Sequence, residues 1–141
     1  MPQAAFSAYR KASHTGLTRI DMLVRLYEST LRTLKDGLAA LQCSDHEQFQ
    51  VEQSLATQYM LAILDGIDPE NGEVAFNSHR LNVYVTGLLM QGTVDSWQSA
   101  IRLLQPLADS FAAIRDEAAA LELSGEIPAL DFRTVYEHST L

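Results

Sequence analysis

Apolar side chains recur every three or four residues in four successive segments of the chain. This spacing places them on one face of an α-helix. The first segment, residues 18–41, begins at Thr18, which can cap a helix, and Asp21 can bond back to the Thr18 amide. It therefore predicts a long amphipathic helix. Its apolar face comprises Met22, Leu23, Leu26, Tyr27, Thr30, Leu31, Leu34, Leu38 and Leu41.

The second and third segments predict two further helices, separated by a turn at Gly66, Pro69 and Gly72. The second begins with a capping box over residues 44–47. Its apolar face comprises Ala56, Tyr59, Met60, Ile63 and Ile67, with Phe49 and Leu55 nearer its start. The third runs from about Glu73 to Met90, and its face comprises Val74, Leu81, Tyr84, Val85 and Leu88.

The fourth segment predicts a helix that begins after Thr93 and continues toward Leu123. Pro106 interrupts it, and we expect a kink rather than a break because the apolar pattern continues beyond the proline. Gly125 and Pro128 then end the regular structure. The apolar face comprises Trp97, Ile101, Leu104, Ala108, Phe111, Ile114 and Ala118.

Four amphipathic helices joined by short connections predict an all-α fold, an antiparallel four-helix bundle. We expect the bundle to span residues 18–123, with an N-terminal arm over residues 1–17 and a short C-terminal extension, a tail over residues 124–141. The pattern indicates no strand and no internal repeat.

The chain is acidic, with a net charge of −8, and its basic residues are scattered. We therefore expect no nucleic-acid partner, because such binding needs clustered Lys and Arg. The acidity favours solubility, or the steering of a basic partner. The single cysteine, Cys43, fits a reducing compartment, and the first residues lack the pattern of a signal peptide. The apolar runs are too short for membrane insertion, so we expect a cytoplasmic protein.

The sequence offers no catalytic or metal-binding motif. It has no Glu-x-x-His, and its histidines are not paired at metal-ligand spacing. It also has no glycine-rich phosphate loop. We therefore expect no enzyme activity, no cofactor and no metal. One distant alternative is a histidine phosphotransfer module, a four-helix bundle with an exposed helical histidine, for which His79 is the candidate.

Some apolar residues fall outside the main faces of their helices, which a simple bundle does not require. They either widen the core or form an outward groove that receives another chain's helix or peptide. These residues are Ile20 and Val24 in the first helix and Phe76, Val83 and Leu89 in the third.

Two stretches resemble the flagellin-specific export chaperones, the FliS family. In the first, Gly16–Tyr27, Thr18 matches the family's capping Ser, Asp21 its Glu, Met22 its Leu, and Leu26 with Tyr27 its Leu-Tyr pair. The second, Ile67–Ala75, looks like the family's Gly-Glu-Ile-Ala turn into the third helix and is followed by Asn77, Leu81 and Tyr84. Arg19 departs from the pattern, since the family has a Pro there.

The resemblance implies a cytosolic chaperone that holds the C-terminal segment of flagellin, prevents premature polymerisation and delivers it for type III secretion. An export-gate component would be a further partner, and the chain itself would be a monomer or weak homodimer. The alternative is a non-enzymatic adaptor that binds another secreted or signalling helix. The expected partner-binding residues are Tyr9, Leu17, Ile20, Val24, Tyr27, Tyr59, Val83 and Tyr84.

Both ends of the chain carry apolar side chains that suggest docking on the bundle. Phe6, Tyr9 and Leu17 lie in the arm, and the family resemblance favours an arm that competes with the client for its groove. The tail contains Ile127, Leu130, Phe132, Val135 and Tyr136, and we hypothesise that it docks on the bundle of its own or a neighbouring chain.

Because the predicted bundle needs no metal to fold, we expect a mostly helical circular-dichroism spectrum and cooperative thermal unfolding that EDTA does not alter. The measurement is a pair of melting curves, with and without the chelator. Loss of helical signal in EDTA would contradict the prediction.

Overall fold

The structure, a computed structural model, describes residues 19–124, which form four α-helices and no strand. The Thr18 cap, the arm with Tyr9 and Leu17, and the tail after Ser124 lie outside the described residues. The helices are α2 (Arg19–Gln42), α3 (His46–Asp65), α4 (Glu73–Gln91) and α5 (Val94–Ser124).

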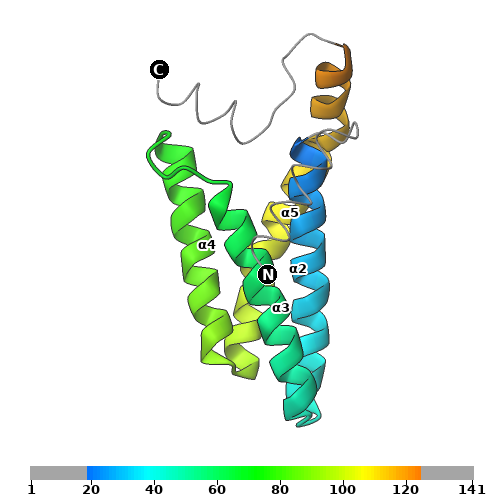
Figure 1. Cartoon of the computed structure of the whole chain (residues 1–141), viewed down its shortest axis with the longest axis vertical. Helices are drawn as coiled ribbons and strands as arrows, with labels where there is room; N and C mark the ends of the chain where they lie inside the picture. Colours follow the sequence, from blue (N-terminus) through cyan, green and yellow to red (C-terminus); the bar gives the residue numbers. More distant parts are fainter. Residues whose placement is uncertain (1–18, 125–141) are drawn as a thin grey trace.

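The helices alternate in direction around a ring (Figure 1). Helix α2 contacts α3 and α5, and α4 contacts the same two helices. The predicted all-α antiparallel four-helix bundle is therefore confirmed. We call the end with the α2–α3 and α4–α5 turns the closed end. The end with the start of α2, the α3–α4 loop and the start of α4 is the open end.

The turn between α2 and α3 corrects the predicted capping box. The N-cap of α3 is Asp45, whose carboxylate accepts a hydrogen bond from the Gln48 amide. Ser44 instead ends α2: its φ is +58°, its amide donates to Leu41 O, and the Asp45 amide donates to Ala40 O. This pair of bonds satisfies two carbonyls in the last turn of α2. The serine serves the helix before it, so the cap shifts by one residue.

Helix α5 begins and continues as the pattern predicts. Thr93 Oγ1 accepts a hydrogen bond from the Ser96 amide, and the Thr93 amide donates one to Ser96 Oγ; each is 3.0 Å long. This reciprocal pair caps the first turn. Pro106 lies inside the helix, which runs on to Ser124.

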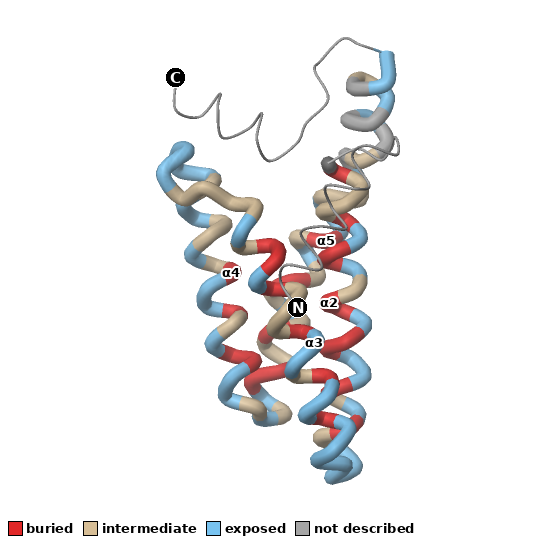
Figure 2. Tube along the Cα trace, viewed as in Figure 1, coloured by how far each residue is buried: buried red, intermediate tan, exposed pale blue. Residues whose placement is uncertain are grey.

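The predicted apolar face of α4 is wrong in part. Val74 and Tyr84 are 81% and 59% exposed. The buried positions all lie in the second half of the helix, which packs between α3 and α5 (Figure 2). The first half, residues 73–81, contains no buried side chain, so an apolar residue there is not a core residue. The buried residues of α4 are Asn82, Val85, Leu88 and Leu89.

Trp97 joins all four helices at the closed end. Its indole packs edge-on against Phe49 of α3, with ring centroids 4.9 Å apart. Its Nε1 donates a hydrogen bond to Leu89 O of α4 at 3.2 Å. On α2, the ring lies so close to Gly37 that a Cβ on that glycine would come 2.3 Å from the indole. Only glycine leaves room for the ring.

The Leu89 carbonyl accepts a second hydrogen bond, from Gln53 Nε2 of α3 at 2.8 Å. This oxygen lies in the last turn of α4, where carbonyls have no partner within the helix. Side chains of α3 and α5 therefore fix the end of α4 through the same atom.

Replacing Gly37 with alanine is expected to destabilise the fold by about 1–3 kcal/mol, because the methyl group overpacks the site beside Trp97. Alanine is otherwise the better helix former. The matched control is Gly87→Ala in α4, where a Cβ meets nothing within 4 Å, so a gain of about 0.5–1 kcal/mol is expected. Urea unfolding of the two variants measures the difference, and equal effects would contradict this account of Gly37.

Candidate binding cleft

A cleft of about 330 Å³ lies at the open end of the bundle. All four helices and the α3–α4 loop contribute to its walls. It exists because the first half of α4 carries no buried side chain and so leaves the ends of the other helices' apolar faces uncovered. The lining residues are Leu23, Leu26, Tyr27, Ala62, Ile63, Gly66, Ile67, Asp68, Asn71, Val74, Ala75, Ser78 and Phe111.

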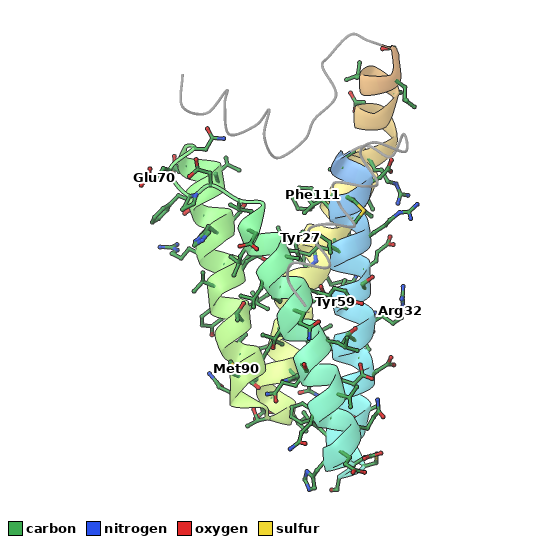
Figure 3. The ribbon with its side chains drawn as sticks, in the orientation of Figure 1. Tyr27, Arg32, Tyr59, Glu70, Met90 and Phe111 are labelled. Atoms are coloured by element: carbon green, nitrogen blue, oxygen red, sulfur yellow. The ribbon has the colours of Figure 1, made fainter. Side chains whose placement is uncertain are left out.

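Tyr27 lies where the cleft meets the core, and it is 2% exposed. Its ring stacks on Phe111 of α5, with centroids 5.5 Å apart and planes at 16° (Figure 3). Its hydroxyl donates a hydrogen bond to Asn82 Oδ1 of α4 at 3.3 Å. Tyr27 therefore connects α2 to both helices that flank the inner end of the cleft, and its burial confirms its place on the predicted apolar face of the first helix.

Asn82 is fully buried, and its amide is satisfied on both sides. Its Oδ1 faces the Tyr27 hydroxyl, and its Nδ2 donates to the Ser78 carbonyl at 2.7 Å. A buried amide without partners would destabilise the fold, so this pair specifies how α4 approaches α2 across the core. Burial also raises the pKa of the Tyr27 phenol.

The polar part of the cleft comes from the α3–α4 loop. Asp68 accepts a hydrogen bond from the Glu70 amide through its carboxylate, and its carbonyl accepts one from the Asn71 amide. Gly72 follows with φ of +103°, a conformation that favours glycine, and forms the N-cap of α4. These bonds hold Asp68 and Asn71 at the rim beside an otherwise apolar surface.

Among the six predicted partner-binding residues that the structure describes, only Tyr27 lines the cleft. Ile20 and Val24 are buried, which fits the wider core. Tyr59 is partly buried against the core. Val83 and Tyr84 are exposed on α4, away from the lining. Tyr9 and Leu17 lie outside the described residues.

Sequence reasoning assigned most of the lining to the core. Leu23, Leu26, Ile63, Val74 and Phe111 line the cleft and belong to the predicted apolar faces. Their spacing is that of core positions, and nothing in it distinguishes a covered turn from an uncovered one. Position offers a signal only for Ile63 and Val74, which lie in the turns of α3 and α4 next to the glycine- and proline-containing loop.

Within residues 19–124, no three His, Cys, Asp or Glu side chains gather where a metal ion could bind. His79, the candidate for phosphotransfer, is partly buried on α4. None of the four described helices is long and apolar enough to cross a membrane.

Comparison with protein-family models, curated proteins and solved structures finds no match to this chain.

Replacing Tyr27 with phenylalanine is expected to change the pH dependence of stability. Burial raises the pKa of the Tyr27 phenol above its ordinary value of 10.0. The neutral phenol therefore contributes its full stabilisation at pH values below 10.0. Above about pH 10 the unfolded chain ionises first, and the free energy of unfolding falls as pH rises through the folded-state pKa. The Tyr27→Phe variant lacks this group, so its free energy of unfolding should fall less over the same pH range. At neutral pH it should be less stable than wild type by roughly 1 kcal/mol, because the hydrogen bond to Asn82 is lost.

Urea unfolding at about pH 8 and pH 11 measures this difference. Tyr84→Phe is the control, because Tyr84 is 59% exposed and has no such burial to lose. An equal fall for wild type and Tyr27→Phe would contradict the assignment.

Proposed function

We propose that this chain is a cytosolic export chaperone that binds the C-terminal segment of flagellin. It keeps that segment from polymerising and delivers it for type III secretion, where a component of the export gate is a second partner. Binding alone performs this task, so it requires no catalytic residue and no cofactor.

The observation that carries the proposal is the meeting of the two family-like stretches at one cleft. Leu23, Leu26 and Tyr27 of the first stretch form one wall, and Ile67, Asp68, Asn71, Val74 and Ala75 of the second form the wall opposite. About forty residues separate the stretches in sequence. Core packing alone would not require both of them to border the same uncovered surface, so their convergence supports a shared binding role.

The chemistry of the cleft suits an amphipathic helix. Leu23, Ile63, Ile67 and Phe111 offer apolar surface, and Asp68 supplies a carboxylate at the rim. A space of about 330 Å³ accommodates a few large side chains rather than a whole helix. The client helix would therefore lie along the mouth of the cleft and insert apolar anchors, as helices bind in grooves elsewhere.

Such binding hides the client surface that would otherwise drive self-assembly. A flagellin terminus must become ordered when it binds, and that loss of entropy reduces the affinity per unit of buried area. A moderate affinity is compatible with release at the export apparatus.

Replacing Val74 with glutamate tests the proposal. Val74 lines the cleft and is 81% exposed, so the change places a charge in the mouth of the cleft without disturbing the core. A glutamate in the first turn of α4 also suits the helix dipole. Calorimetric titration with a flagellin C-terminal peptide should show binding to wild type and at least about tenfold weaker binding to Val74→Glu.

The matched control is Val51→Glu on α3, a valine that is 52% exposed and lies outside the cleft. It should bind the peptide as wild type does. Absence of peptide binding to wild type, or equal binding to the Val74 variant, would overturn the proposal. Binding of other secreted helices in preference to flagellin would favour the adaptor alternative.

A further inference from the structure

The outer face of α4 carries an apolar stripe that no described residue covers. Phe76, Val83 and Met90 are seven residues apart and are 52%, 48% and 58% exposed. Seven residues are close to two helical turns, so the three side chains follow one line along the helix. This stripe lies on the side of α4 opposite its buried residues, and Met90 marks its lower end in Figure 3.

A glycine lies in the stripe. Gly87 is between Val83 and Met90, and a Cβ there would meet nothing within 4 Å. Glycine in the interior of a helix costs about 1 kcal/mol relative to alanine. Packing among the described residues does not explain that cost, whereas close approach of another helix would.

The stripe also lies on the helix of the bundle with the fewest carboxylates. From Val74 to Gln91 the sequence contains no Asp or Glu, although the chain has 18 of them and a net charge of −8. Helix α3 carries Glu47, Glu52 and Asp65, and α5 also carries several carboxylates. A basic partner would be attracted to those helices. Two copies of this acidic chain that meet through residues 74–91, in contrast, bring no carboxylate of one segment against a carboxylate of the other.

We propose that a second copy of the chain docks on this stripe, with the two α4 helices antiparallel about a two-fold axis at Val83. The stripe is symmetric about that residue, so Val83 meets Val83 and Phe76 meets Met90 of the second copy. In the same register, Gly87 lies opposite His79 of the second copy, so the His79 imidazole faces a position that has no side chain. A two-fold interface requires such a self-complementary surface.

The interface is a single helix pair along roughly 21 Å of α4, from Phe76 to Met90. It is smaller than the interfaces of stable dimers, so we expect a dissociation constant of roughly micromolar or weaker, with monomers at lower concentrations. The stripe and the cleft occupy different sides of α4, since Val74, Ala75 and Ser78 line the cleft and the stripe residues do not. Dimerisation therefore does not depend on the proposed function.

Cysteine cross-linking tests the register. In a Cys43→Ser background, which removes the only native thiol, Val83→Cys should form a disulfide-linked dimer under mild oxidation. Val51→Cys on α3 is the control, because Val51 is 52% exposed and Val83 is 48% exposed. Phe76→Cys alone should cross-link poorly, because Met90 lies opposite it. Efficient cross-linking through Phe76 would mean a parallel pair, and equal cross-linking of the two valine variants would mean random collision; either result overturns the proposal.

Sedimentation of the full chain provides a second measurement. The average mass of wild type should rise above 15.6 kDa with concentration. Val83→Glu places two like charges on the axis and should weaken the dimer at least about tenfold, while Val51→Glu behaves as wild type. Circular dichroism verifies that both variants remain folded. A wild type that stays at 15.6 kDa up to about millimolar concentration would overturn the proposal, including the case in which the chain's own arm or tail covers the stripe.

Discussion

The contact between Trp97 and Gly37 is the constraint on which the rest of the bundle depends. The indole belongs to α5, lies over Gly37 of α2, packs against Phe49 of α3 and donates a hydrogen bond to the Leu89 carbonyl of α4. Protein interiors are close-packed, so one large ring in contact with four helices fixes their separations at that level. A side chain at residue 37 would move the ring and, with it, the ends of all four helices.

The open end of the bundle is packed less completely than the closed end. Helix α4 is buried only from Asn82 onward, and Tyr27 and Asn82 form the last buried polar contact before the cleft. Beyond this pair, apolar side chains of α2, α3 and α5 continue toward the end of the bundle without a covering helix. The cleft is thus the unclosed part of the core, and its apolar character follows from that origin.

Helix α4 presents two different faces. One packs in the core along the second half of the helix and borders the cleft at its first turns, and the other carries the stripe of Phe76, Val83 and Met90 toward solvent. The absence of carboxylates from Val74 to Gln91 distinguishes this helix from its neighbours in an acidic chain. The proposed client and the proposed second copy would use opposite sides of this helix and different side chains.

The sequence by itself determined the fold class and the helix positions. The three-to-four-residue spacing of apolar side chains, the turn residues Gly66 and Gly72, and the Thr93 cap are local signals, and local backbone energetics act on them directly. The α2–α3 turn shows the limit of this reasoning, since either Ser44 or Asp45 satisfies a capping pattern and only the geometry of the preceding helix selects between them.

Only the tertiary structure decided which apolar residues remain uncovered. Val74 and Val85 belong to the same predicted face of α4, yet Val74 is exposed at the cleft and Val85 is fully buried. Val24 and Val83 both lie outside their predicted faces, yet the first is in the core and the second faces solvent. Burial depends on how closely the neighbouring helices approach at each level, and that distance is set by remote contacts such as Trp97 on Gly37. The periodicity of the sequence identifies the apolar face of a single helix, whereas the cleft depends on how several helices are placed relative to one another.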